Sequence, residues 1–215
     1  TSNCDKNFLI EQFGKNYISK IKVRKNWVSS KHKNPLKPFD ERYDDKIVCI
    51  GRLEDQKNYE TIIKALKETN FKLDIFGAGV QKNRLIQLAK IQNVDINFKG
   101  IIDNNELKEL LKNYKYYLTA SKFEGNPKSV LEAMSAGCVV IASDIKNHTE
   151  FLNNKNSILF KGENSLSKIL RNLNNNQYDF INLTENALLT ISENYDLKTT
   201  ATLEVNDINE IATIT

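Results

Sequence analysis

The residues of this chain best suited to chemistry are two carboxylates that flank the expected start of a helix. Glu124 and Glu132 lie eight positions apart in the segment EGNPKSVLEAM, with a Gly-Asn-Pro turn signal between them. Pro127 suits the first turn of a helix, because the N–H that it lacks would be unpaired there anyway. The residues after it have free backbone N–H groups. These groups and the helix dipole together favour the binding of an anion.

We expect the free amides to be those of Ser129, Val130 and Leu131, and phosphate to be the anion that suits them. The two carboxylates cannot both serve that phosphate, but they accept hydrogen bonds from sugar hydroxyl groups well. A diphosphate between two hydroxyl-bearing groups describes a nucleotide-sugar. The alternative interpretation is that both glutamates bind no ligand and only interact favourably with the positive end of the helix dipole.

Two cations stand in another loop, within the segment GRLEDQKN. Arg52 and Lys57 lie five positions apart, across this loop and into the start of the next helix. They could clamp the same diphosphate, since a leaving phosphate needs neutralisation more than covalent help. As isolated cations, they could also be solvated surface charges.

The elements that must position these residues alternate regularly from residue 46 onward. Apolar runs of strand length occur at 46–51, 71–77, 94–100, 115–120, 138–143 and 157–160. Amphipathic helical segments occur at 58–69, 81–92, 104–114 and 127–137, with a short one near 148–153. This alternation predicts an α/β fold with a doubly wound parallel sheet of about six strands. Ligands of such sheets bind beyond the carboxyl ends of the strands, where both loops belong.

The two flanks do not follow this repeat. The first 45 residues predict a helix over 5–14, a strand over 20–28 and a polar linker with two prolines. Residues 165–215 predict helices that are separated by asparagine-rich breaks, of which NLNNNQ is the clearest.

Composition limits the function classes further. Of the 215 residues, 40% are hydrophobic and 27% are charged, and the net charge is +4. The basic residues are dispersed and are not interleaved with aromatic residues, as a nucleic-acid-binding surface requires. We expect no nucleic-acid partner and, from three cysteines without metal-ligand spacing, no metal site and a reducing cytosol. No apolar run is long enough to span a membrane. The only methionine is Met134, so we expect a fragment or a processed product.

The ordered set of segments resembles a known family. EGNPKSVLEAMSAGCVVIAS resembles the E-x7-E signature and following strand of GT-B retaining glycosyltransferases of family 4, the glycosyl transferases group 1. VCIGRLEDQKN resembles the Gly-Arg-Leu…Lys-Asn loop of their C-terminal, donor-binding domain, and FKLDIFGAG resembles the strand before their Gly-x-Gly turn. The resemblance is strong over residues 46–160. It implies a Rossmann-like GT-B C-terminal half with C-terminal helices.

The resemblance also implies roles for individual residues. Arg52 and Lys57 match the pair on the donor diphosphate, Glu124 matches the glutamate at the donor sugar, and Glu132 matches the glutamate on the ribose. The other donor-binding positions are Gly51, Gly79, Lys99, Gly100, Ile101, Gly125, Asn126, Ser129, Val130 and Leu131. The implied substrate is a nucleoside-diphosphate sugar, foremost of UDP, with GDP or ADP as alternatives, and no cofactor is expected.

The implied domains are a remnant of the N-terminal acceptor domain with a linker (1–45), a nucleotide-sugar-binding Rossmann-like domain (46–195) and a C-terminal helix (196–215). A saccharide or lipid-linked acceptor would bind the missing N-terminal domain. We expect a cytoplasmic location, with the full-length protein at the cytoplasmic membrane face. Two alternatives stay open: a GT-B epimerase or phosphorylase, and a non-catalytic nucleotide-binding module. A dinucleotide dehydrogenase is disfavoured, since no Gly-x-Gly-x-x-Gly follows the first strand.

Several conspicuous residues have structural interpretations. We expect His148 to be exposed near a helix start, Tyr116 and Tyr117 to pack in the core, and Cys138 to be inert in packing. The glycines of GAG are expected to form a turn, with Gly79 near the ligand.

Overall fold

Strands and helices alternate along the chain in a computed structural model, which describes residues 2–29, 35–175 and 177–212. The strands are β1 (Tyr43–Ile50), β2 (Lys72–Phe76), β3 (Ile96–Gly100), β4 (Tyr114–Thr119), β5 (Val139–Ser143) and β6 (Ile158–Phe160). The helices are α1 (Asn3–Phe13), α2 (Tyr59–Leu66), α3 (Lys82–Gln92), α4 (Asn104–Leu111), α5 (Lys128–Ser135), α6 (Lys146–Thr149), α7 (Gly162–Asn172), α8 (Phe180–Asn194) and α9 (Leu197–Ala212). The 3-10 helices in these ranges are η1 (Lys15–Lys20), η2 (Phe39–Glu41) and η3 (Asp55–Lys57).

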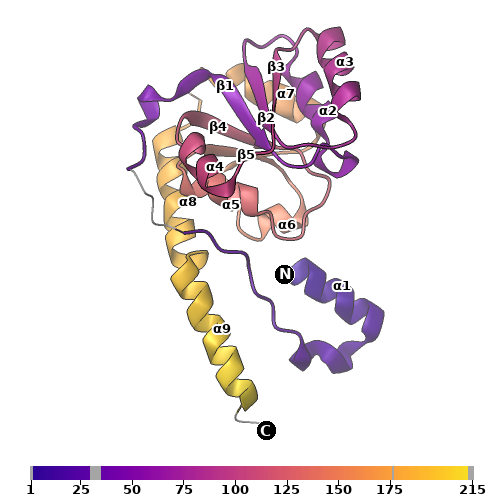
Figure 1. The fold of residues 1–215 in the computed structure, drawn as a ribbon, viewed down its shortest axis with the longest axis vertical. Helices are drawn as coiled ribbons and strands as arrows, with labels where there is room; N and C mark the ends of the chain where they lie inside the picture. Colours follow the sequence, from indigo (N-terminus) through magenta and orange to yellow (C-terminus); the bar gives the residue numbers. More distant parts are fainter. Residues whose placement is uncertain (1, 30–34, 176, 213–215) are drawn as a thin grey trace.

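The strands form one parallel sheet in the order β3-β2-β1-β4-β5-β6 (Figure 1). The chain moves outward from β1 in one direction, then returns to β4 on the other side of β1. This reversal makes the sheet doubly wound and confirms the predicted fold class. All six predicted strands are present, and β1 begins at Tyr43, three residues before the predicted start.

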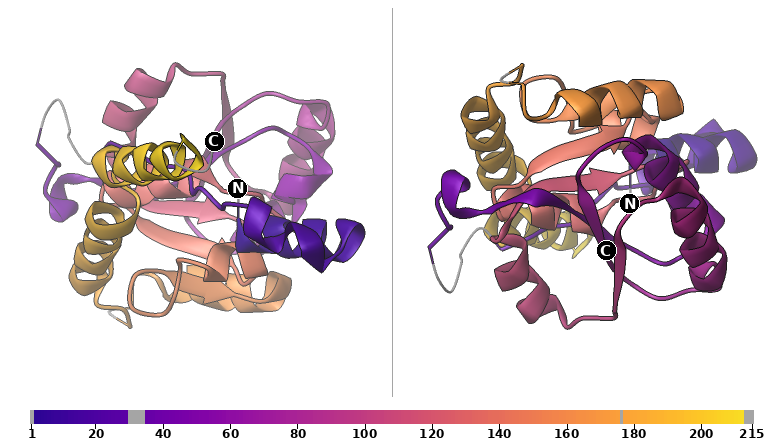
Figure 2. Two further views of the ribbon diagram at one scale, coloured as in Figure 1. Left: turned by 90° about the horizontal axis from the view of Figure 1, so that it is seen from below. Right: turned by 90° about the horizontal axis from the view of Figure 1, so that it is seen from above.

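Each strand contributes side chains to both faces of the sheet, as expected for a parallel sheet that is covered on both sides. In β1, Ile47 and Cys49 pack towards α2, α3 and α7, while Val48 packs towards α4, α5 and α8. Tyr116 and Tyr117 divide between the same two cores, so their predicted packing role is confirmed. Figure 2 shows the sheet between the two layers of helices.

The prediction of a strand over 20–28 is wrong. Residues 21–28 follow η1 without a strand, and only Val28 forms an isolated bridge, to Asp196. Extended residues form a strand only where a neighbouring strand offers its ladder of N–H and C=O groups, and β-propensity alone does not supply one. This segment instead contacts α9, where Lys22 and Arg24 both form ion pairs with Asp207.

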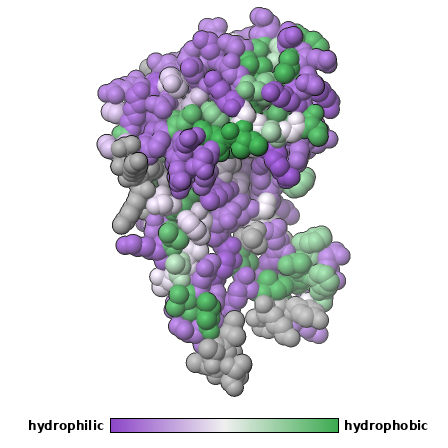
Figure 3. Space-filling view, viewed as in Figure 1, coloured by the Kyte–Doolittle hydropathy of each residue, from purple (hydrophilic) through white to green (hydrophobic). Residues whose placement is uncertain are grey.

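The helices α1 and α9 lie below the layered part of the molecule in Figure 1. Both expose large apolar side chains, among them Phe8 and Phe13 on α1 and Leu203 and Ile208 on α9. Figure 3 shows this apolar surface at the same end of the molecule. Within the described ranges, every helix is too short or too polar to cross a membrane.

Candidate functional site

Two loops at the carboxyl edge of the sheet carry a cation and a carboxylate that pair with each other. Because β1 and β4 are neighbours, the loops after them, 51–58 and 120–127, begin side by side. Lys57 Nζ lies 2.5 Å from Glu124 Oε1, and their side chains are only 16% and 8% exposed. Partial removal from water strengthens the attraction between the two charges.

Ser121 completes what we call the cation–carboxylate cluster, which consists of Lys57, Ser121 and Glu124. The Ser121 hydroxyl donates a hydrogen bond of 2.5 Å to Glu124 Oε1. Its carbonyl accepts a hydrogen bond of 2.7 Å from the hydroxyl of Ser143 at the end of β5. Sequence reasoning missed Ser121, although its place between the end of β4 and Glu124 was a usable signal.

The start of α5 differs from the prediction at two amides. Val130 N donates to the carbonyl oxygen of Pro127 over 3.1 Å, and Leu131 N donates to the same atom over 3.4 Å. These two N–H groups are therefore not free, because Pro127 is the N-cap, with its carbonyl already accepting intrahelical bonds. In the described part of the chain, only the amides of Lys128 and Ser129 lack a partner at this helix start.

Glu132 lies in the second turn of α5 and is 5% exposed. Burial raises its pKa above the ordinary value, while nearby Lys128 and Lys108 and a hydrogen bond with Asn104 oppose this shift. Its Oε1 atom is buried and has no hydrogen-bond partner among the described residues. In the protein without a ligand, a buried acceptor that has no partner is destabilising. Such an acceptor can accept a hydrogen bond from a hydroxyl group of a ligand.

The prediction that His148 is exposed is wrong. The side chain is fully buried in α6, and its Nδ1 atom lies 2.8 Å from the carbonyl oxygen of Ser143. Burial lowers its pKa, while the hydrogen bond with the Ser143 backbone and the charge of Glu124 act to raise it and Lys57 acts to lower it. Ser143 links the ring to the cation–carboxylate cluster, because its hydroxyl donates to the Ser121 carbonyl. The partner of the ring is a carbonyl at the end of β5, so no local pattern in the sequence indicated this burial.

The sequence profile of the family Glycosyl transferases group 1 matches residues 31–188. The chain belongs to this family. In fold it corresponds to the C-terminal half of GT-B glycosyltransferases, in agreement with the resemblance seen in its sequence.

Three similar proteins illustrate this membership. An N-acetylgalactosamine-N,N'-diacetylbacillosaminyl-diphospho-undecaprenol 4-alpha-N-acetylgalactosaminyltransferase of Campylobacter jejuni is 34% identical over 107 residues, which are 48% of this chain and 29% of the relative. A mutant of S. aureus TarM, in complex with Fondaparinux, alpha-GlcNAc-glycerol and UDP, aligns with a TM-score of 0.81 at 22% identity, over 95% of this chain and 42% of TarM.

The third is the C-terminal domain of the group 1 protein LpcC from Francisella tularensis. It aligns with a TM-score of 0.66 at 21% identity, over 79% of this chain and 99% of that domain. The group 1 chain therefore spans less than half of the Campylobacter relative and of TarM, and nearly all of an isolated C-terminal domain.

Arg52 lies in the same loop as Lys57 but outside the cation–carboxylate cluster of this group 1 chain. Its side chain is 70% exposed and pairs with Glu54, with 3.2 Å between Nη1 and Oε1. Arg52 and Lys57, the two residues predicted to bind the diphosphate, therefore pair with different carboxylates in this structure. Gly125 and Asn126, which the prediction placed under the donor, lie in the loop after Glu124, where their carbonyls accept from Asn147 and Asn26.

The glycines of the group 1 chain hold the loops after β1 and β2 against each other. A Cβ atom on Gly77 would lie 1.9 Å from the carbonyl oxygen of Gly51, and one on Gly79 would lie 2.6 Å from that of Leu53. The expected turn role of GAG therefore has a steric basis. Gly51 also leaves room for the Lys57 side chain, whose Cε would lie 3.0 Å from an added Cβ.

Lys99, Gly100 and Ile101 lie at the end of β3, two strands away from β1 at the same sheet edge. Gly100 has a φ of 77° and its carbonyl accepts from the amide of Gly77 over 2.8 Å. The Ile101 side chain is 85% exposed, and this exposure leaves an apolar surface open at the edge.

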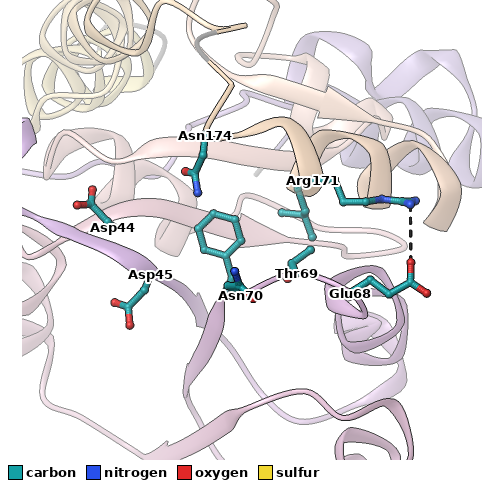
Figure 4. A pocket seen from close by; sticks show the side chains of 9 residues that line it. Asp44, Asp45, Glu68, Thr69, Asn70, Arg171 and Asn174 are labelled. Atoms are coloured by element: carbon teal, nitrogen blue, oxygen red, sulfur yellow. Dashed lines mark ion pairs between the residues drawn. The ribbon is translucent and has the colours of Figure 1, made fainter.

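A hollow of about 300 Å³ lies at the opposite, amino-terminal edge of the sheet. Figure 4 shows Asp44 and Asp45 on one side of it and Glu68, paired with Arg171, on the other. Asp44, Asp45 and Glu68 are each paired with a cation, Lys115, Lys72 and Arg171 respectively. We therefore do not assign the functional site to this hollow.

Proposed function

We propose that this chain is the donor-binding half of a retaining glycosyltransferase, which transfers a sugar from a nucleoside-diphosphate sugar to an acceptor. The observation that carries the proposal is the cation–carboxylate cluster next to the start of α5. There Lys57 and the carboxylate of Glu124 belong to the loops after β1 and β4, and the second of these loops leads directly to the unpartnered amides of Lys128 and Ser129 at the start of α5. Cation and amides suit a diphosphate, while the carboxylate suits sugar hydroxyl groups.

Lys57 would neutralise the charge that develops on the diphosphate as it leaves. An ammonium group offers three donors, so it can bind phosphate oxygens and still keep a bond to Glu124. The pairing with Glu124 also holds the lysine at the site in advance, which favours electrostatic stabilisation of a leaving group. Arg52, whose side chain is exposed, would turn from Glu54 to the same diphosphate.

Glu132 would accept a hydrogen bond from a ribose hydroxyl group through its unpartnered oxygen. The base would lie against residues 99–101, and UDP is the first nucleotide to test, since the TarM mutant was solved with UDP. GDP and ADP are the alternatives. The name of the Campylobacter relative contains a lipid-linked acceptor, diphospho-undecaprenol, and this favours a saccharide or lipid-linked acceptor at a cytoplasmic membrane face.

Isothermal titration of the chain with UDP, GDP and ADP tests donor binding. We expect binding of one nucleotide, weakened about tenfold by Lys57→Ala and by Glu132→Ala and less by Arg52→Ala. Lys168→Ala on α7 is the matched control for loss of a lysine and should bind as the parent does. Equal binding by the parent and all three site variants would contradict the assignment.

Retention of configuration needs a separate measurement. The anomeric coupling constants of the donor and of the glycoside product are compared by proton NMR in a turnover assay. The same anomer in both supports retention, and the opposite anomer in the product contradicts it.

A further inference from the structure

The loop between β4 and α5 is held by side-chain amides from three other parts of the chain. Gln56 Nε2 donates to the carbonyl of Phe123 over 2.9 Å. Asn147 Nδ2 donates to the carbonyl of Gly125 over 3.4 Å, and Asn26 Nδ2 donates to that of Asn126 over 2.6 Å. The loop has no regular structure of its own, so these bonds help to fix its conformation.

Gln56 differs from the other two because it also uses its backbone. Its carbonyl oxygen accepts a hydrogen bond of 2.9 Å from the amide of Lys122. Two bonds from one residue thus join consecutive positions, Lys122 and Phe123, to the loop after β1. Gln56 precedes Lys57 and Phe123 precedes Glu124, so the joined positions adjoin both partners of the ion pair.

The direction of the Phe123 carbonyl has a further effect on the backbone. A trans peptide unit points its C=O and the following N–H to opposite sides. Holding the Phe123 carbonyl towards Gln56 therefore turns the amide of Glu124 away from Gln56. The same bond consequently limits both the orientation of the Glu124 backbone and the position of its carboxylate relative to Lys57.

We propose that Gln56 is a positioning residue of the donor site. It holds Lys57 and Glu124 in their positions relative to each other and thereby sets the affinity for the diphosphate. Its effect on the ligand rests on the proposed function, whereas its effect on the ion pair does not. Gln56→Ala removes the side-chain bond and keeps the backbone bond. Gln56→Glu keeps the size of the side chain but replaces its donor with an acceptor that repels the Phe123 carbonyl.

The first test uses no ligand. The coupling between Lys57 and Glu124 is measured from the free energies of unfolding of Lys57→Ala, Glu124→Ala and the double variant, with Gln56 and again with Gln56→Ala. We expect the coupling to fall to about half or less when Gln56 is replaced. Gln87→Ala, which removes an exposed glutamine of α3, should leave it unchanged. Equal coupling with and without Gln56, or no coupling in the parent chain, would overturn the proposal.

The second test measures affinity for UDP. We expect Gln56→Ala and Gln56→Glu to weaken binding roughly 3- to 10-fold, and Gln56→Ala to have no further effect once Lys57 is alanine, because it acts through that residue. Additive losses would indicate a merely structural role and contradict the inference. If Lys57→Ala leaves UDP binding intact, the proposed function fails, and the coupling measured without ligand still decides the role of Gln56.

Discussion

Glu132 is a single side chain that lowers the stability of the protein and offers a hydrogen-bond acceptor to a ligand. Its carboxylate is buried with an unpartnered oxygen, an arrangement that destabilises the folded chain. Burial also raises its pKa, so neutral pH forces a charge into a site that disfavours it. A carboxylate kept in this state is better explained by a ligand that completes its hydrogen bonds than by packing.

The pH dependence of stability tests this interpretation. Between the ordinary pKa of 4.5 and the raised pKa, folded Glu132 keeps a proton that the unfolded chain releases, so its contribution to stability is lost as pH rises through this window. We expect Glu132→Gln to abolish that loss and to raise the Tm at pH 7, by about 2–4 °C for each kcal/mol gained. Thermal unfolding across pH 4–8 measures it. Exposed Glu185→Gln is the control, and an unchanged profile in Glu132→Gln would contradict the prediction.

His148 has the opposite pH dependence. Burial lowers its pKa from the ordinary 6.5, so below that pH the unfolded chain binds a proton that the folded chain resists. Stability from His148 is therefore present above about pH 6.5 and is lost as pH falls through the lowered pKa. We expect His148→Leu to flatten this acid loss and, at pH 7, to destabilise by about 1–2 kcal/mol, because the Ser143 carbonyl loses its donor. Urea unfolding from pH 5 to 7.5 measures both effects. His32→Gln, which replaces the other histidine of the sequence, serves as the control.

Among the secondary-structure elements, the loops after β1 and β2 are set by close contact between their backbones. Gly77 has a φ of 152° and no room for a Cβ atom beside Gly51. This contact fixes where the Lys57 loop leaves the sheet. The glycines therefore help to position Lys57, whose side chain also lies against Gly51.

Alanine substitution separates the effect of a clash at the added Cβ atom from the effect of a positive φ on the backbone. We expect Gly77→Ala to destabilise by about 2–4 kcal/mol, because its Cβ would clash with a backbone atom that cannot move away. Gly162→Ala is the matched control, since Gly162 has a φ of 73° but nothing within 4 Å, and should cost only about 1 kcal/mol. Denaturant unfolding measures both. Equal losses would show that contact with Gly51 is unimportant.

Much of the fold was predictable because the parallel strands have a strong local pattern. Buried strands such as β1 and β5 are short apolar runs, and amphipathic helices lie between them. The failed strand over 20–28 mixes apolar and cationic residues, and no described strand lies beside it; partner strands are a property of the tertiary structure. For the same reason the sequence did not predict that His148 would be buried.

The candidate site was predictable only in part. Lys57 and Glu124 were identified because both follow strands whose ends share one edge of a doubly wound sheet. Gln56 was not, since its importance comes from a hydrogen bond to a different loop. Ser121 was missed although it lies in the same loop as Glu124, because its bond to that carboxylate depends on the conformation of the loop. The free amides of Val130 and Leu131 were predicted wrongly, because the N-cap carbonyl of Pro127 binds both.

At the scale of the whole molecule, α9 exposes apolar surface. Leu203, Val205 and Ile208 are 48%, 54% and 64% exposed. We expect their joint replacement by serine to shift the Tm by less than about 2 °C, because little packing is lost. It should also reduce self-association, which exposed apolar surface promotes. Calorimetry and sedimentation velocity measure the two effects. Replacing buried Leu183 by serine, as a control, should lower the Tm clearly.

The reversal of direction at β1 has a consequence for synthesis on the ribosome. Lys46 in β1 pairs with Lys72 in β2, a strand made soon afterwards, whereas Ile47 pairs with Tyr116 in β4, which is made much later. At roughly 5–20 residues per second, the β4 side of β1 stays unpaired for several seconds after its β2 side is satisfied. A nascent chain with an open, apolar strand edge is prone to aggregate. Productive folding of this protein therefore depends on protecting β1 until β4 emerges.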